Sequence, residues 1–206
     1  MNKIIDLTME LTTETQSYPG DSKIEILRNK TYQKDGYTLF DVKMNMHVGT
    51  HIETMMHLSE DLRYIKDIQL EYFYGSATLI SQPNEKVITW DEKYNTMNIE
   101  KIVLIHTGFD VYQNTDTYFL EHPILSESFI DKLIEKGIKV IGIDFPSPDY
   151  FPYLIHKKLF ENEIFIIENL TNLKSLIKYE SFIFSALPLK IQTEASPVRA
   201  VAIIKK

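Results

Sequence analysis

Short apolar runs, four to eight residues long, recur along the whole 206-residue chain between polar segments. They are rich in Ile, Val and Phe, and their length suits strands better than helices. Several are nearly continuous, as in strands that are covered on both faces of a sheet. The pattern therefore predicts strands at residues 4–7, 39–46, 77–80, 102–105, 138–143, 164–167, 182–187 and 198–204.

Helical signals are fewer. The clearest predicted helix covers residues 126–136, where Ser126 can cap the N-terminus, apolar residues recur on one face and Gly137 suits the C-terminal end. Two weaker helices are expected after Pro152 and after Thr171. Many strands and few helices predict an α/β fold with a substantial mixed sheet.

Length and charge narrow the class of protein. A chain of 206 residues fits a single domain over residues 1–206. The net charge of −7, without a cluster of Lys and Arg, argues against nucleic acid and acidic membranes as partners. No apolar run is long enough to span a bilayer, and acidic residues interrupt the N-terminal segment before a signal peptide could form. We therefore expect a cytoplasmic protein.

Three of the six histidines lie between residues 47 and 57, with a carboxylate among them. In a pure strand His47 and His51 would lie about 13 Å apart, too far to share one ion. In a helix, Glu53 would face away from His51. One ion can gather all three side chains only if the backbone turns, which Gly49 permits. We predict a strand end, a bend at Gly49, and then the start of a helix or loop.

The chemistry of this cluster suits a divalent metal. The chain has no cysteine, so a metal would be held by imidazole, carboxylate and water, which favours zinc or manganese. Two imidazoles and one carboxylate leave room for a water, which loses a proton near neutral pH and becomes a nucleophile. His57 is then predicted to be a general acid or base. The alternatives are a buried polar knot without metal and a surface cluster.

Two acids follow apolar runs elsewhere. Glu168 ends one predicted strand and Asp144 follows another, positions where α/β proteins often place site residues. Equally, Glu168 can open the next helix, and Asp144 and Asp149 can cap a proline-rich turn. His156 precedes a predicted helical stretch.

Three other polar residues carry weaker signals. His106, at a strand end, is predicted to be structural. His122, directly before a proline, is predicted to lie on the surface. Arg199 could bind a carboxylate or form an ordinary ion pair.

The segment His47–Glu53 resembles the H-x-G-T-H-x-D signature of the cyclase-like kynurenine formamidase (arylformamidase) family of metal-dependent hydrolases. Further blocks that resemble this family occur in the same order across nearly the whole chain. These blocks are Tyr18–Asp21, Thr107–Gly108, Gly142–Asp144, Ile167–Leu170 and Ser196–Val201.

The resemblance implies a swivelling β/β/α domain that assembles as a homodimer or homotetramer. It implies one or two divalent ions, with zinc favoured and manganese as an alternative. By resemblance, the metal ligands would be His47, His51, Glu53, His156 and Glu168. Glu53 would bridge, and His156 with Glu168 would bind a second ion or complete a single site. His57 matches the catalytic histidine, and Tyr18 is expected to pack against an aryl substrate.

The implied reaction is hydrolysis of a carbon–nitrogen amide bond in a small molecule, with N-formylkynurenine giving kynurenine and formate in tryptophan breakdown. Isatin, another cyclic amide or a lactone is the alternative substrate. A third possibility is a metal-binding protein without catalysis.

The chain departs from the family pattern at two positions. Glu53 stands where the signature has Asp, and Met55 stands where a proline is usual. The longer Glu53 side chain shifts a bridging carboxylate by about 1 Å unless the backbone gives way. Because of these departures, the resemblance alone does not fix the number of metal ions or the exact substrate.

Overall fold

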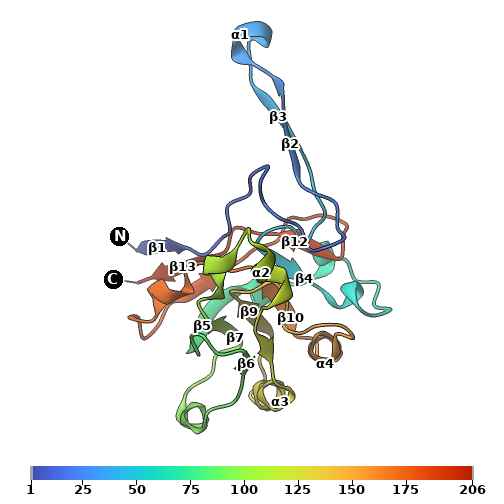
Figure 1. The fold of residues 1–206 in the computed structure, drawn as a ribbon. Helices are drawn as coiled ribbons and strands as arrows, with labels where there is room; N and C mark the ends of the chain where they lie inside the picture. Colours follow the sequence, from blue (N-terminus) through green and yellow to red (C-terminus); the bar gives the residue numbers. More distant parts are fainter. Residues whose placement is uncertain (1, 206) are drawn as a thin grey trace.

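The computed structural model describes residues 2–205, and a nine-stranded mixed sheet forms its centre (Figure 1). The strand order is β1-β13-β11-β5-β7-β9-β10-β4-β12. Neighbours from β5 to β10 run parallel, and the pairs toward both edges run antiparallel. The strands are β1 (Lys3–Asp6), β4 (His51–Glu53), β5 (Tyr74–Ser81), β7 (Ile102–His106), β9 (Val140–Ile143), β10 (Phe165–Glu168), β11 (Ile183–Ser185), β12 (Ala195–Pro197) and β13 (Val201–Ile204).

The parallel centre of the sheet carries much of the core. Every residue of β7, β9 and β10 is buried, as expected for strands rich in Ile, Val, Leu and Phe that are covered on both faces. Helix α3 (Glu127–Glu135) begins at Ser126, whose hydroxyl accepts a hydrogen bond of 3.2 Å from the Phe129 amide. Helix α4 (Leu154–Glu161) packs against β10 and α3 (Figure 1).

Short elements complete the described chain. Helices α1 (Tyr32–Asp35) and α2 (Asp116–Leu120) are brief, and β6 (Val87–Ile88) pairs with β8 (Ile124–Leu125). Single 3-10 turns lie at Met55–His57, Ile65–Asp67, Leu70–Phe73, Glu92–Thr96, Phe109–Tyr112 and Leu173–Leu176. Within residues 2–205, none of the helices combines the length and apolarity that a membrane crossing requires.

A two-stranded hairpin projects far from the sheet (Figure 1). Strand β2 (Glu25–Lys30) pairs with β3 (Leu39–Lys43), and α1 joins them at the tip. We call residues 23–43 the arm. All five residues of β3 are exposed, including Phe40 and Val42 at about half of their full surface. The apolar run at 39–46 forms a strand as predicted, but it is not buried within this chain.

The mixed α/β fold with few helices is confirmed, and each of the eight predicted strands overlaps an observed one. The helix expected after Pro152 is α4, whereas the one expected after Thr171 is only a 3-10 turn at Leu173–Leu176. The prediction of a helix or loop after Gly49 is also wrong in part, because the chain first forms strand β4. Strands β4 and β12 have three residues each, too few for a periodic signal.

Candidate metal centre

The bend at Gly49 brings the first three predicted ligands together. Gly49 has φ +71°, and a Cβ added there would clash with the Leu11 side chain, so this turn requires glycine. The turn carries His47 back over β4, where His51 and Glu53 point to the same face of the sheet because they are two residues apart. His47 Nδ1 lies 2.7 Å from Glu53 Oε1.

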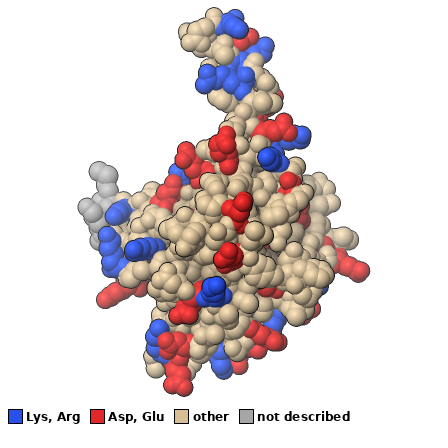
Figure 2. All heavy atoms as spheres, viewed as in Figure 1, with Lys and Arg blue, Asp and Glu red and all other residues tan. Residues whose placement is uncertain are grey.

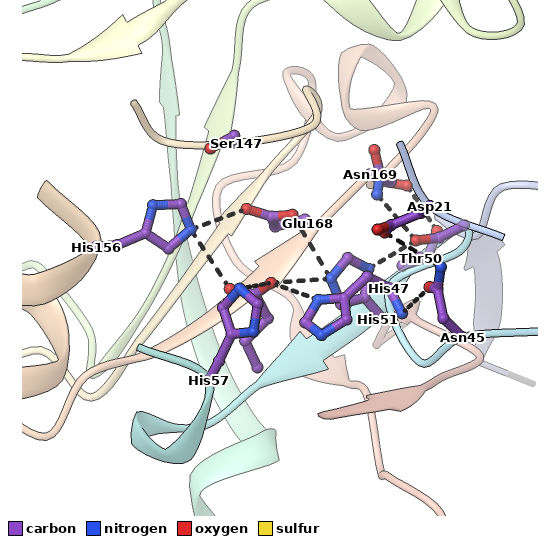
Figure 3. Close-up of polar contacts among 12 residues, drawn as sticks. Asp21, Asn45, His47, Thr50, His51, His57, Ser147, His156, Glu168 and Asn169 are labelled. Atoms are coloured by element: carbon purple, nitrogen blue, oxygen red, sulfur yellow. Dashed lines mark hydrogen bonds and ion pairs between the residues drawn. The ribbon is translucent and has the colours of Figure 1, made fainter. Parts of the chain in front are cut away.

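The neighbouring strand and α4 supply the other two predicted ligands. Glu168 lies directly opposite His51 in the antiparallel β10–β4 pair, and His51 Nε2 is 3.5 Å from Glu168 Oε2. His156, on α4, places Nε2 3.4 Å from Glu168 Oε1 and 3.4 Å from Glu53 Oε2. Segments more than 100 residues apart in the sequence thus converge on Glu53. Figure 3 shows Glu168 in contact with both His156 and His51.

Two of the imidazoles have their orientation fixed from outside the cluster. His51 Nδ1 donates to the Gly49 carbonyl at 2.9 Å, and His156 Nδ1 donates to Asp149 Oδ1 at 2.6 Å. Each ring therefore turns Nε2 toward the carboxylates of Glu53 and Glu168. A hydrogen bond at one ring nitrogen that frees the other for an ion is the usual arrangement of metal-ligating histidine.

The two carboxylates are buried and incompletely satisfied. Glu53 and Glu168 are 2% and 5% exposed, and Glu53 Oε2 and Glu168 Oε1 have no hydrogen-bond partner within residues 2–205. Buried carboxylate oxygens without partners are costly unless a cation neutralises them. Ligand atoms of His47, His51 and Glu53 lie within 4.8 Å of one another, as do those of Glu53, His156 and Glu168. The donor set fits one or two divalent ions, with Glu53 common to both groups.

The pKa values show how strongly this site attracts positive charge. Burial works to lower the pKa of His47, but hydrogen bonds with Glu194 and Glu53 raise it to about 10. Burial works against ionisation of Glu53 too, yet the neighbouring imidazoles of His156, His47 and His51 hold its pKa well below the usual range. Burial, together with the charge of Glu53, raises the pKa of Glu168.

His57 lies at the edge of this cluster and differs from the other histidines. It ends the 3-10 turn that follows β4, and its Nε2 is 3.8 Å from Glu53 Oε1. Its side chain is partly exposed and lines the pocket above the carboxylates. Burial lowers its pKa, so that the ring is neutral at pH 7 and able to accept a proton.

A pocket of about 390 Å³ opens above the cluster. Tyr18 and Phe119 form one aromatic wall, with ring centroids 5.6 Å apart and an edge-to-face angle of 79°. Tyr153, Leu58 and Pro146 add further apolar surface. The volume and the mostly apolar walls suit a small organic molecule.

Two functional candidates escape prediction from the sequence. Glu194, directly before β12, places Oε1 3.1 Å from His47 Nε2. The sequence offers Asp149 only as a cap of the proline-rich turn. In the structure it accepts a hydrogen bond from the Ile155 amide at the start of α4 and orients His156. Asp144 lies apart from the cluster and accepts hydrogen bonds from the Thr107–Gly108 turn.

The three polar residues with weaker sequence signals all lie outside the metal centre. His106 is buried and hydrogen-bonded to Ser81, as predicted for a structural residue. Arg199 is exposed and pairs with Asp6, which favours the ordinary ion pair over a substrate contact. The prediction that His122 lies on the surface is wrong: it is 4% exposed and stacks on Tyr150, with ring centroids 4.0 Å apart.

The buried His122 should make the fold acid-sensitive. Burial lowers its pKa to about 4, below the ordinary value of 6.5 that it regains on unfolding, so its contribution is complete above pH 6.5 and is lost as the pH falls toward 4. In His122→Phe, which keeps the stacking, the drop in unfolding free energy between pH 7.5 and pH 5 should be smaller by about 2 kcal/mol. Urea unfolding at both pH values measures this, and an unchanged drop would show that His122 is not neutral in the fold.

Comparisons with known proteins agree with this geometry. Residues 5–150 match the model of the family described as "Putative cyclase". The uncharacterized protein MJ0783 of Methanocaldococcus jannaschii is 37% identical over 205 residues, covering 98% of this chain and 100% of that protein. The chain belongs to the cyclase family.

Two further proteins that are similar to this chain extend the comparison. A kynurenine formamidase of Bacillus cytotoxicus is 27% identical over 96% of this chain and 95% of its own length. Isatin hydrolase A from Ralstonia solanacearum superposes with a TM-score of 0.85 at 21% identity, over 99% of this chain and 92% of that chain, so the two share a fold.

Proposed function

We propose that this cyclase-family chain is a metal-dependent hydrolase of carbon–nitrogen amide bonds, with N-formylkynurenine as substrate and kynurenine and formate as products. The observation that carries the proposal is the pair of oriented imidazoles, His51 and His156, whose Nε2 atoms face the buried carboxylates of Glu53 and Glu168. Each of these carboxylates keeps one oxygen without a hydrogen bond among the described residues. Kynurenine formamidases that align over nearly the full chain support the choice of substrate.

The metal ligands in this proposal are His47, His51, Glu53, His156 and Glu168, which would hold one or two Zn²⁺ ions, with Mn²⁺ as the alternative. A bound ion supplies Lewis acidity toward the substrate carbonyl and lowers the pKa of water.

The protein's own side chains perform the remaining steps. Neutral His57 accepts a proton from the attacking water and then donates a proton to the leaving nitrogen, since it reaches the pocket beside Glu53. Tyr18 and Phe119 pack against the aryl group and orient it. Tyr18 acts as a neutral phenol here, because burial raises its pKa to about 12.

The second candidate function is hydrolysis of a cyclic amide such as isatin, or of a lactone. The match in fold to isatin hydrolases over nearly the full chain favours it. The third reading, a metal-binding protein without catalysis, rests on Glu53 in place of the usual Asp.

Protein purified without chelator should carry divalent metal and release formate from N-formylkynurenine. Parallel assays with isatin and simple lactones separate the first candidate from the second. Metal content without hydrolysis of any of these substrates would leave only the third reading.

Asp149→Asn should weaken metal binding by about 10–100-fold, because a partner that orients a ligating histidine typically contributes that much. Titration of the metal-free protein with Zn²⁺ measures the change. Glu135→Gln, which removes an exposed carboxylate of α3, is the control, and equal affinities of the two variants would contradict the role given to Asp149.

We further propose that the protein is a homodimer or homotetramer in which the arm packs against a second copy. A two-stranded ribbon that is exposed along β3 is marginal in water on its own. The arm carries five Lys or Arg and three Asp or Glu, whereas the whole chain has a net charge of −7. Figure 2 shows Lys and Arg on the outer part of the arm and many Asp and Glu on the body below it, which suits an arm-to-body contact between copies.

Leu27→Ser combined with Phe40→Ser should shift the protein toward monomer in sedimentation velocity, because both side chains are about half exposed on the arm. Ile177→Ser, an exposed apolar position on the body, is the matched control and should leave the assembly intact. A wild-type protein that is monomeric at all concentrations would contradict the arm contact.

A further inference from the structure

The pocket above the candidate metal centre combines apolar walls with carboxylates. Among the described residues that line it, four are carboxylates and none is Lys or Arg. The four are Asp21, Glu53, Glu168 and Glu194. With His47 and His156 serving as neutral metal ligands, a carboxylate group of a substrate meets no cationic side chain among the described residues that line this pocket.

The four acids form two levels. Glu53 and Glu168 lie at the buried floor, where imidazoles and the proposed ion neutralise them. Asp21 and Glu194 stand higher, toward solvent: Asp21 is exposed, and the Glu194 side chain is 34% exposed. The upper pair is the one available to a substituent of the substrate that points away from the scissile bond.

Asp21 and Glu194 are each held by a neighbouring side chain that is neither Lys nor Arg. Asp21 accepts a hydrogen bond of 3.2 Å from the neutral Asn45 side chain, and Glu194 contacts His47 at 3.1 Å. Neither acid forms an ion pair with Lys or Arg within residues 2–205. A histidine that ligates a metal is a neutral imidazole. In that role His47 would not neutralise the charge of Glu194.

The aromatic walls add a second attraction for cations. Tyr18, Phe119 and Tyr153 line the same pocket, and the faces of aromatic rings attract ammonium groups. Aromatic rings beside carboxylates are a general arrangement for binding organic cations. The same walls give an anionic group no compensation for the water that it loses on entry.

We propose that the pocket selects aryl amides that carry a cationic amine substituent and discriminates against those whose only charge is a carboxylate. The inference rests on the proposed amide hydrolysis and names the substrate class of that site. Asp21 and Glu194 are the specificity-determining residues of the pocket. They attract the cationic substituent, while the metal centre at Glu53 and Glu168 binds the amide.

The test uses three formanilides with side chains of similar size at the ortho position: dimethylaminoethyl, which is cationic, isopentyl, which is its neutral isostere, and carboxyethyl, which is anionic. With protein purified without chelator, kcat/KM should fall from the cationic to the neutral to the anionic compound, by about tenfold or more at each step at low salt. Glu194→Gln and Asp21→Asn should each reduce the ratio of cationic to neutral kcat/KM by about 3–10-fold. Glu135→Gln changes the net charge equally at a distant exposed site and should leave the ratio unchanged.

Binding of the three corresponding anilines, measured by calorimetry, gives a readout that does not need turnover. The same order of affinity without hydrolysis would support the charge selection and count against the proposed hydrolysis. Equal kcat/KM and equal affinity across the series, or a preference for the anionic compound, would overturn the inference and leave the hydrolase proposal standing.

Discussion

His51→Ala should remove most bound metal and reduce kcat/KM by at least about a hundredfold, because loss of a ligand costs more than loss of its outer hydrogen-bond partner. His51 is fully buried, and its Nε2 faces Glu53 at 3.3 Å and Glu168 at 3.5 Å. Removing it leaves two adjacent buried carboxylates with less compensation, which weakens the site at its centre.

Elemental analysis of the purified variant, beside the formate-release assay, measures both effects. His106→Gln is the matched control, since His106 is also buried but hydrogen-bonds to Ser81 outside the cluster. Circular dichroism establishes that both variants are folded. A folded His51→Ala protein with full metal content would show that the imidazole is not a ligand.

His57→Ala should keep the metal and lose about 10²–10⁴-fold in kcat, the range that a general acid–base residue contributes. Its side chain is partly exposed, its Nε2 lies 3.8 Å from Glu53 Oε1, and burial lowers its pKa so that the proton-accepting form prevails at pH 7. Loss of proton transfer should therefore reduce turnover more than substrate binding.

This variant decides whether His57 carries a proton or binds the metal. KM should change much less than kcat, and the metal content should equal that of the wild type. Should His57→Ala lose its metal together with its activity, His57 would be a ligand and the proton would need another carrier.

The histidine cluster is predictable because its geometry is local. His47, His51 and Glu53 lie within seven residues, and Gly49 between them is the one residue type that the observed φ of +71° accommodates without strain. The elements that follow are harder to predict, since β4 has only three residues and exists because β10 and β12 flank it. The sequence pattern therefore indicates the bend but not the strand.

Long-range partners lie beyond what a sequence pattern can show. Glu194 is 147 positions from His47, and no periodicity connects the two. His122 precedes a proline, a common surface context, yet Phe145 and Tyr150 enclose it in the fold. The arm shows a different limit: the apolar residues of β3 predict a strand correctly, but all five residues of that strand are exposed in this chain.

The base of the arm and the mouth of the pocket are built from the same residues. Asp21 precedes the arm and Asn45 follows it, the two side chains are hydrogen-bonded, and both line the pocket. A displacement of the arm would therefore shift two residues that line the pocket. If the arm packs against a second copy, turnover per chain should depend on protein concentration. Dilution that dissociates the copies should raise KM before it changes the buried metal-binding residues.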